Sequence, residues 1–521
     1  MQPRFLSSAL GMLAVAALLG LACSPDAPPV AASTPVVPIA SAAEASSTPA
    51  ATPDARGAAP SEPVGALLLD WDSGEATPLH PTTLEVVPGS VDIDGWVASV
   101  SPDGRWVITR TQQVITGARV IPGDLVIYER ATWREAARLD QFEGYPGQWA
   151  PDSDAFYAWF DHCGSPAAEG VCLGEWDRGV ARVGLDGRVE RLATFDFSAT
   201  TRAIAPDGAY AYALALRTDI CCGIGAESDP FLARIDLATG EVTAELALPD
   251  LYVGQPRHWL GVEGTYARYH PEIAISPDGE RLYLVHSEED VVTVVDLARM
   301  AVEETRSFAE RPSALGRFGS WLRSQFVSVA HAKGGPAYYR QAALTEDGRH
   351  LLVSGTTVRG TPETVEAGEP WESRPAGLTV LDLETLEVVF RDPDIATFEV
   401  SADGGRLIGY GSWHPAEPPD DPRASNRALG DGLLVLDLAT FEVAHHLWPG
   451  EALRAASLSA DGRYAYARSD GPGMDQWYID NTNCTADCER VRVVDLATGA
   501  VVTDRTLGRG HGLHVLTPQR P

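Results

Sequence analysis

The chain has 521 residues, of which 72 are acidic and 40 are lysine or arginine, so its formal net charge at pH 7 is −32. This charge argues against nucleic acid as a partner and against adhesion of the protein surface to anionic lipid. Much of the acid falls in predicted loops, where we interpret it as a solvated surface, with attraction of cations or basic partners as the alternative.

Residues 1–23 have the pattern of an export signal. The segment MQPRFLSSALGMLAVAALLGLAC carries one positive charge at Arg4 and an apolar run from Leu10 to Leu21. The run is shorter than the roughly 20 residues of a membrane-spanning helix. The segment resembles a bacterial lipoprotein signal, although Gly20 stands where that family usually has leucine. The resemblance implies lipidation at Cys23, with ordinary signal-peptide cleavage nearby as the alternative.

Residues 24–64 are dominated by alanine, proline, serine and threonine and contain no aromatic residue. This composition predicts a solvated tether between the signal and one folded domain, residues 65–521. We therefore expect an exported cell-envelope protein that faces the periplasm or the cell exterior. Its contact with a membrane would be made only through the N-terminal lipid anchor.

One tetrapeptide, with close variants, recurs seven times along the folded domain. It reads SPDG at Ser101 and Ser276, APDS at Ala150, APDG at Ala205, TEDG at Thr345, and SADG at Ser401 and Ser459. Each copy lies between two short apolar runs, as in EIAISPDGERLYLVHS from Glu272, which is typical of a β-hairpin turn. A second hairpin follows each copy, as in VTVVDLARMAVEETRSF from Val292. Each unit is therefore predicted to contain four antiparallel strands.

Seven such units predict an all-β fold, a single β-propeller of seven full blades, because a lone four-stranded sheet cannot cover both of its apolar faces. The motifs resemble the YVTN-type propellers, and residues 272–308 match best. That superfamily shares its architecture with the haem d1 domain of cytochrome cd1 nitrite reductase and the large subunit of amine dehydrogenases. Since the matching residues belong to turns and strands, the resemblance implies a fold and not an activity.

The two ends of the folded domain favour an eighth, composite blade. The stretch ALLLDWDSGEATPL from Ala66 resembles an extra outer hairpin, and GLHVLTPQ from Gly512 resembles an extra inner strand. Pairing the chain ends in one sheet would close the ring and leave no free edge. The alternative is a seven-bladed ring with the terminal strands packed outside it.

The longest predicted connections lie on one face of the propeller. They join the second strand of a blade to its third, or one blade to the next, and comprise residues 160–178, 217–231, 249–270, 309–339, 356–376, 411–432 and 469–490. Long loops on one face of a rigid scaffold are typical of a binding surface. We interpret this face as the functional surface.

Six cysteines besides Cys23 fall as close pairs in three of these loops: Cys163 and Cys172, Cys221 and Cys222, and Cys484 and Cys488. Export favours disulfides over a metal site, and no metal site is predicted. Cys484 and Cys488 are predicted to pair with each other, whereas the other four either pair locally or cross-link their two loops. A bond between the adjacent Cys221 and Cys222 would be strained, because their Cα atoms lie about 3.8 Å apart, below the roughly 4.4 Å limit of ordinary disulfides. We interpret it as a stiffened loop tip, with a redox-active bond as the alternative.

Candidate ligand-binding residues are cationic groups near the starts of the innermost strands and aromatic residues in the long loops. The cationic set is Arg202, His270, Arg340, Arg454 and His514, and the aromatic set is Trp259, Trp371 and Trp477. Arginines that converge at the mouth of the central channel would suit a carboxylate or a phosphate. The alternatives are that each arginine pairs with an acidic residue of a neighbouring blade and that the aromatic residues only hold the loops in place.

No catalytic residue is assigned from the sequence, and no cofactor can be named. The chain contains no Cys-x-x-Cys-His haem attachment, no Gly-x-Ser-x-Gly elbow and no glycine-rich phosphate loop. We expect a membrane-tethered binding or scaffold propeller that takes a small anionic molecule, a glycan or an envelope protein. The alternative is a propeller enzyme, either a quinone-cofactor-type oxidoreductase or a lactonase-like hydrolase, acting at the channel mouth.

Overall fold

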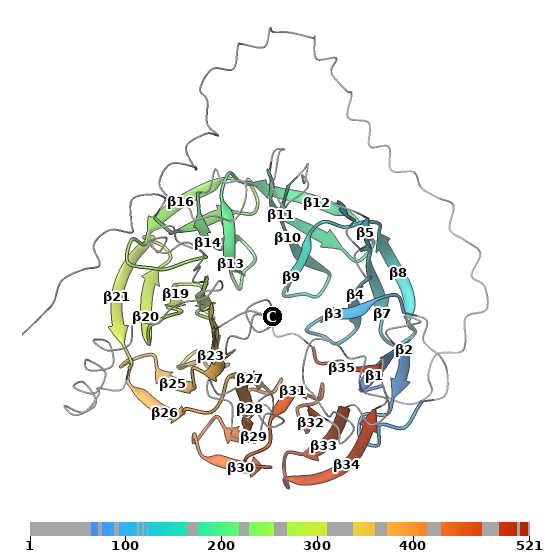
Figure 1. The fold of residues 1–521 in the computed structure, drawn as a ribbon. Coiled ribbons are helices and arrows are strands. Elements are labelled where there is room, and N and C mark those ends of the chain that lie inside the picture. The colour runs from blue at the N-terminus through green and yellow to red at the C-terminus, as the bar shows by residue number, and fades with distance from the viewer. Residues whose placement is uncertain are drawn as a thin grey trace, which may run out of the picture. The chain divides into compact units, whose positions relative to one another are not determined.

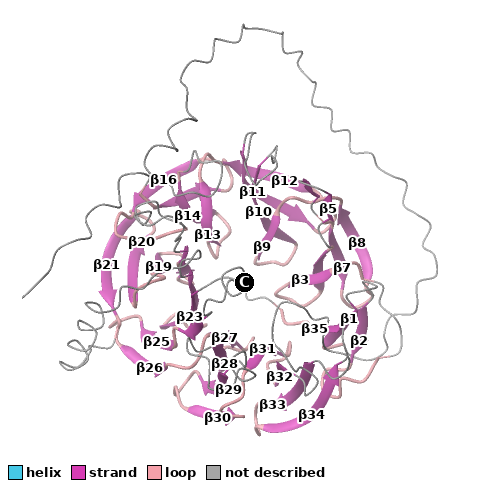
Figure 2. Ribbon diagram, in the orientation of Figure 1, coloured by secondary structure: helices cyan, strands magenta, loops and turns pink. Residues whose placement is uncertain are grey.

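In a computed structural model, the regular elements are strands, labelled β1 to β35, and no helix occurs in the described residues (Figures 1 and 2). The structure describes residues 64–70, 76–87, 93–111, 114–116, 119–121, 123–163, 176–217, 229–254, 268–309, 337–359, 372–413, 429–470, 489–507 and 511–518. Over these residues, no helix is long and apolar enough to cross a membrane.

Seven sheets each contain the four antiparallel strands of a blade, with the first strand innermost and the fourth outermost (Figure 1). Blade 1 comprises β3 (Trp96–Val100), β4 (Trp106–Arg110), β7 (Leu125–Glu129) and β8 (Arg134–Leu139). Blade 2 comprises β9 (Tyr145–Trp149), β10 (Ala155–Cys163), β11 (Trp176–Gly184) and β12 (Val189–Thr194). Blade 3 comprises β13 (Ser198–Ile204), β14 (Tyr210–Leu216), β15 (Phe231–Asp236) and β16 (Val242–Ala247). Blade 4 comprises β18 (Glu272–Ile275), β19 (Arg281–Val285), β20 (Val291–Asp296) and β21 (Ala301–Ser307).

The remaining full blades follow the same order. Blade 5 comprises β22 (Ala337–Leu344), β23 (His350–Arg359), β25 (Leu378–Asp382) and β26 (Val388–Asp392). Blade 6 comprises β27 (Thr397–Val400), β28 (Arg406–Trp413), β29 (Leu429–Asp437) and β30 (Val443–Leu447). Blade 7 comprises β31 (Leu453–Leu458), β32 (Tyr464–Asp470), β33 (Glu489–Asp495) and β34 (Ala500–Leu507). Four short strands lie outside this scheme: β5 (Val114–Thr116), β6 (Arg119–Ile121), β17 (Arg268–His270) and β24 (Glu372–Pro375).

Both ends of the folded domain build the eighth blade, which confirms the eight-bladed interpretation. The C-terminal β35 (His511–Val515) pairs antiparallel with β1 (Ala66–Asp70), and β1 pairs with β2 (Ala76–Leu79). As the sequence pattern predicts, the N-terminal hairpin forms the outer pair of this blade and the C-terminal strand its inner strand. The described sheet has three strands, so β1 pairs directly with β35. Hydrogen bonds from Arg130 to the Val64 carbonyl and from Tyr466 to the Pro81 carbonyl tie this blade to blades 1 and 7.

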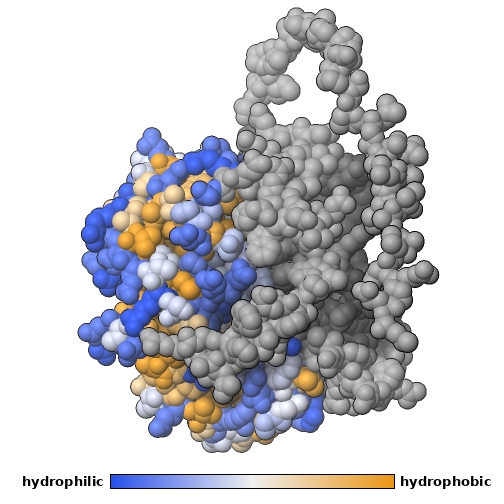
Figure 3. Space-filling view, turned by 60° about the vertical axis from the view of Figure 1, so that its left-hand side comes forward, coloured by the Kyte–Doolittle hydropathy of each residue, from blue (hydrophilic) through white to orange (hydrophobic). Residues whose placement is uncertain are grey.

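The hydrophobic core is divided among the blade interfaces. The buried apolar side chains of the described residues form eight clusters, one between each two consecutive blades, including those on either side of blade 8. The middle strands of a blade are buried on both faces, as β14 illustrates, whereas the outermost strand β16 alternates half-buried and exposed positions. Figure 3 accordingly shows hydrophilic and apolar residues interspersed over the visible described surface. The ring is therefore held together by packing of sheet on sheet.

The recurring tetrapeptide closes the turn between the first two strands of a blade. In the copies at Ser101, Ser401 and Ser459, the serine hydroxyl donates to the aspartate carboxylate two residues later at 2.6 Å. The same carboxylates accept the backbone N–H of the residue two positions further on. The last position takes a left-handed conformation, with φ of 69° at Gly104, which favours glycine. The repeat is thus explained by turn chemistry alone.

Candidate functional site

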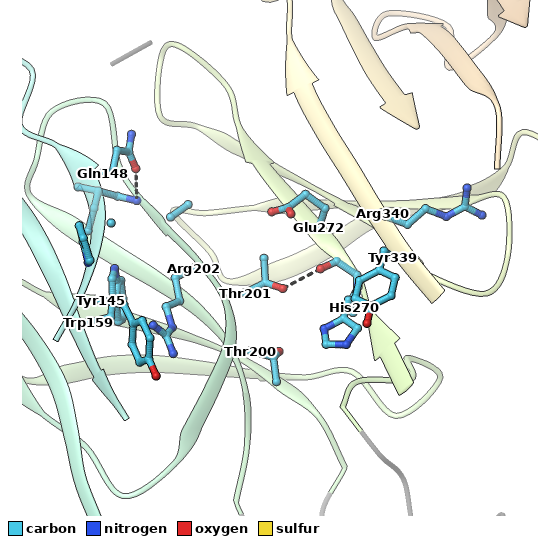
Figure 4. Close-up of a pocket in the computed structure, with 15 residues that line it drawn as sticks. Tyr145, Gln148, Trp159, Thr200, Thr201, Arg202, His270, Glu272, Tyr339 and Arg340 are labelled. Atoms are coloured by element: carbon cyan, nitrogen blue, oxygen red, sulfur yellow. Dashed lines mark hydrogen bonds between the residues drawn. The ribbon is translucent and has the colours of Figure 1, made fainter. Parts of the chain in front are cut away.

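A cavity of about 590 Å³ lies on the wall of the central channel, where the innermost strands of blades 2 to 5 meet (Figure 4). Its lining comes from β9 and β10 of blade 2, β13 of blade 3, β17 and β18, and β22 of blade 5. Three of the five predicted cationic residues line it: Arg202, His270 and Arg340. The fold therefore brings these three predicted residues to one cavity, although their side chains make different contacts there.

Strand β17 shapes one side of the cavity. It runs parallel to β22, with His270 opposite Tyr339, and adds a strand to the inner edge of blade 5. Pro271 follows at once and lacks the N–H needed to continue that pairing, so the chain passes into β18 of blade 4. The predicted loop 249–270 thus ends in a strand that joins two blades, which its composition does not reveal.

The first wall of the cavity is an aromatic stack on this added strand. The rings of His270 and Tyr339 lie 4.5 Å apart between centroids and within 5° of parallel. Tyr339 retains 42% of its surface exposed, so one face of the stack is accessible. Behind it, the ring of Tyr269 stacks between those of Tyr252 and Tyr338, which fixes the strand in place.

The second wall combines aromatic rings with a guanidinium group. Arg202 lies over the ring of the buried Trp159 at 5.4 Å, and its Nε and one terminal nitrogen donate to the Ala199 carbonyl at 3.2 and 2.9 Å. An irregularity in the pairing of β13 between Ala199 and Thr201 lets the side chain fold back in this way. Tyr145, half of whose surface is exposed, lies beside Arg202 in Figure 4.

Polar side chains lie between the two walls. Thr201 donates to the Pro271 carbonyl at 2.7 Å, and the side-chain oxygen of Gln148 accepts the Ile204 N–H at 3.0 Å. Both bonds link neighbouring blades, whose inner strands share no backbone ladder here. The Glu272 carboxyl also lies between the walls in Figure 4, where it accepts the Ile273 N–H at 3.1 Å. Burial raises the pKa of Glu272 to about 7, and only this N–H opposes the shift.

Arg340 does not present its charge to the cavity. Its Nε donates to the carbonyls of His286 and Ser287 at 3.2 Å each, and a terminal nitrogen pairs with Asp290 at 3.1 Å. The side chain is only 6% exposed, and in Figure 4 the guanidinium points away from Glu272. Asp290 belongs to blade 4 and Arg340 to blade 5, so the interpretation as an inter-blade ion pair applies, and Arg340 serves as a structural anchor.

The other predicted cationic residues lie elsewhere on the channel wall. Arg454 is exposed on β31 of blade 7, and His514 lies on β35 of blade 8, away from the cavity lining. Burial, together with the nearby charge of Arg468, lowers the pKa of His514 to about 4. A neutral imidazole at pH 7 contributes no charge to an anion site.

Several predicted positions lie outside the described residues. They are Trp259, Trp371, Trp477 and the cysteines Cys23, Cys172, Cys221, Cys222, Cys484 and Cys488. Cys163 ends β10, but its side chain is likewise outside what the structure describes. The predicted disulfides therefore stay predictions. Among the described side chains, no group of three or more His, Cys, Asp or Glu residues lies so as to hold a metal ion.

Sequence reasoning missed the other lining residues, which include the aromatic Tyr145, Trp159 and Tyr339 and the polar Gln148, Thr200, Thr201 and Glu272. Glu272 stands four residues before the turn serine of its repeat, where the repeats of blades 3 and 5 have Thr201 and Gln341. Superposing the repeats places these three polar side chains at one equivalent position of the innermost strand. The aromatic residues carry no such signal, because aromatic side chains also fill the core between blades.

Comparison with known proteins finds solved structures of low similarity only. No protein-family model matches the chain, and no curated protein matches it. Among solved structures, dihydro-haem d1 dehydrogenase NirN is 14% identical, with 88% of this chain and 78% of that chain covered and a TM-score of 0.45. The periplasmic gluconolactonase PpgL of Pseudomonas aeruginosa is 14% identical, with 75% and 96% covered and a TM-score of 0.38. Hydrazine synthase of Kuenenia stuttgartiensis is 19% identical, with 58% and 64% covered and a TM-score of 0.31, so this chain spans less than two thirds of that one. At these identities the likeness concerns the fold alone.

Proposed function

We propose that this propeller is a binding protein whose channel-wall cavity takes a small, ring-shaped polar ligand that carries a carboxylate, of the class of the sugar acids. The observation that supports it is the facing of two walls across one cavity: Arg202 over Trp159 on one side and the His270–Tyr339 stack on the other. Aromatic faces suit the apolar faces of a sugar ring, and a guanidinium suits a carboxylate.

Size and polarity favour this ligand class over the broader expectation of any small anion. The cavity of about 590 Å³ is within the range of small-molecule sites and is too small for a folded partner. Thr200, Thr201 and Gln148 add hydroxyl and amide groups that can bond to ligand hydroxyls. Of the two arginines that line the cavity in the described residues, Arg340 pairs with Asp290, and Arg202 lies over Trp159 with bonds to the Ala199 carbonyl. A multiply charged phosphate is therefore a poorer match than a monocarboxylate.

Binding of D-glucuronate, measured by titration calorimetry on the whole chain at pH 6, tests this function. Replacing Arg202 with glutamine removes the charge that would hold the carboxylate, so affinity should fall about 10-fold to 100-fold. The matched control is Arg188→Gln, an exposed arginine in a turn of blade 2, which should leave the affinity unchanged. Equal affinity of the Arg202→Gln protein and the unaltered protein would contradict the assignment.

We also propose that the protein is exported and tethered by a lipid at Cys23, with residues 24–64 as the spacer, and that its remaining six cysteines form three disulfides. The pattern of residues 1–23 supports export, and the pairing of the cysteines along the chain supports oxidation. Labelling with radioactive palmitate should be lost in Cys23→Ala, and the denatured mass should lie six hydrogens below that of the reduced chain. Labelling that is retained in Cys23→Ala would refute lipidation at Cys23. Six intact thiols would refute the three disulfides.

A further inference from the structure

Glu272 is the exceptional residue of the cavity. It is a largely buried carboxyl whose one bond in the described part of the chain is to the N–H of its own neighbour, Ile273. Salt bridges to Glu272 are absent over the same residues, although two arginines line the cavity. A buried carboxyl that forms no ion pair holds its proton more tightly than an exposed one, so burial raises the pKa of Glu272.

Each of the other charged and titratable groups around Glu272 makes its contacts with residues other than Glu272 in the described part of the chain. From β13, Arg202 bonds to the Ala199 carbonyl and lies over Trp159; from β22, Arg340 pairs with Asp290. From β17, His270 stacks on Tyr339. Tyr145 on β9 also lines the cavity, and Arg110 lies over its ring. His286, which follows β19, is outside the lining and bonds to Thr293. Among the described residues that line the cavity, Glu272 is the one carboxyl that a ligand would meet.

A ligand carboxylate beside Arg202 would share this cavity with Glu272. Two ionised carboxylates in a partly buried site repel each other, so one of them is favoured in its protonated form. A neutral sugar has no such conflict, because its hydroxyls can donate to an ionised Glu272 or accept from a protonated one.

We propose that Glu272 is the specificity-determining residue of the cavity: it admits an acidic sugar only together with a proton, and a neutral sugar with or without one. This inference rests on the proposed function. It adds that an acidic sugar binds together with one proton, and that binding therefore depends on pH. The protein would hold acidic sugars in a mildly acidic medium and release them as the medium becomes alkaline.

The test measures binding of D-glucuronate and of D-glucose by calorimetry on the whole chain at pH 6 and pH 8. D-glucuronate has a carboxylate where D-glucose has a hydroxymethyl group. With a free-state pKa of Glu272 of about 7, the affinity for D-glucuronate should be about tenfold weaker at pH 8. The affinity for D-glucose should not change. At pH 8, heats in two buffers of different ionisation enthalpy should show uptake of about one proton per D-glucuronate bound.

Variants separate Glu272 from the other titratable group of the cavity, His270. Glu272→Gln mimics the protonated carboxyl and should abolish the pH dependence, while the control Glu280→Gln, an exposed residue of the same blade, should retain it. His270→Gln should weaken binding at both pH values and leave their ratio near tenfold. If Glu272→Gln does not fold, two measurements still test the inference. They are the proton uptake from the two buffers and the ratio of affinities at pH 6 and pH 8 in His270→Gln.

Two results would overturn the inference. A pH dependence that survives Glu272→Gln and disappears in His270→Gln would move the proton to the imidazole and leave the proposed function intact. Absence of binding of either sugar at both pH values would remove the proposed function and this inference with it.

Discussion

Arg202 and Arg340 show what decides the role of a single side chain in this protein. Both are arginines in innermost strands, and both line the same cavity. Arg340 meets Asp290 of the preceding blade and is buried in an ion pair, whereas Arg202 folds back onto Trp159 at the cavity. The sequence identifies both positions, but the partner comes from another blade. Which of the two side chains packs at the cavity and which pairs with a neighbouring blade could not be predicted from either residue alone.

A second buried carboxyl, Glu399 on β27, should make the stability of the fold depend on pH. Burial raises the pKa of Glu399 to about 7, opposed by a bond from the Leu458 N–H. Because the folded-state pKa lies above the unfolded value, the contribution to stability is fully present below about pH 4.5 and is lost as the pH rises through about 7. Glu399 should therefore lower the free energy of unfolding by up to about 3 kcal/mol at pH 8 relative to pH 4.5.

Glu399→Gln should remove this loss, and denaturant unfolding at pH 5 and pH 8 measures it. The control Glu442→Gln changes an exposed carboxyl of the same blade and should keep the pH dependence of the unaltered protein. An unchanged difference between the two pH values in Glu399→Gln would show that this carboxyl titrates as if it were exposed.

At the scale of the strand, turn chemistry is predictable and strand additions are not. In all seven turns the aspartate carboxylate accepts the backbone N–H two residues later, so the positions of these hairpins follow from the sequence. Strand β17 owes its existence to Tyr269 and His270 stacking on Tyr338 and Tyr339, which lie far along the chain. The composition around residues 268–270 does not indicate contacts with residues so distant in the sequence. Strand β17 and the cavity wall that it forms were therefore not predicted.

Backbone crowding distinguishes two glycines of blade 6. Gly432 in β29 has φ of 74°, and a Cβ there would lie 2.0 Å from the Leu447 carbonyl oxygen. Gly450 has φ of 86°, but a Cβ there would meet nothing within 4 Å. Gly432→Ala should lower the free energy of unfolding by more than about 2 kcal/mol, and Gly450→Ala by only about 1–2 kcal/mol, the cost of the left-handed conformation.

Thermal or denaturant unfolding of the two variants decides this prediction. The difference between them isolates the clash from the conformational cost, since both positions have positive φ. Equal losses in the two proteins would mean that β29 shifts to accommodate the methyl group and that the packing of β29 against the Leu447 carbonyl is loose.

At the scale of the whole molecule, the ring is the feature that sequence predicts best. Seven repeats predict seven blades, and the two chain ends together supply the strands of an eighth. Each blade needs a neighbour on both faces, and apolar clusters lie on both sides of blade 8. The repeat period is visible in the sequence, whereas the position of β1 within blade 8 depends on pairing across the two chain ends. That detail required the structure.

Closure by the C-terminal strand should be needed for a stable monomer. Deleting residues 511–521 removes β35, takes Leu513 and Leu516 out of two clusters and leaves the edge of β1 unpaired. We expect a lower thermal midpoint and self-association through the exposed edge, measured by calorimetry and light scattering. Deletion of residues 519–521 alone is the control and should change neither. A monomeric truncated protein with an unchanged midpoint would show that β35 is not the closing strand.

A crystal structure of the protein with D-glucuronate at pH 6 tests the central claim, that the channel-wall cavity binds an acidic sugar, most directly. The account predicts a sugar ring between the Trp159–Arg202 wall and the His270–Tyr339 wall. Its carboxylate should lie within about 3 Å of the Arg202 guanidinium, and a ligand hydroxyl should lie within the same distance of Glu272. A ligand bound elsewhere on the propeller with this cavity empty, or one whose carboxylate faces away from Arg202, would contradict it.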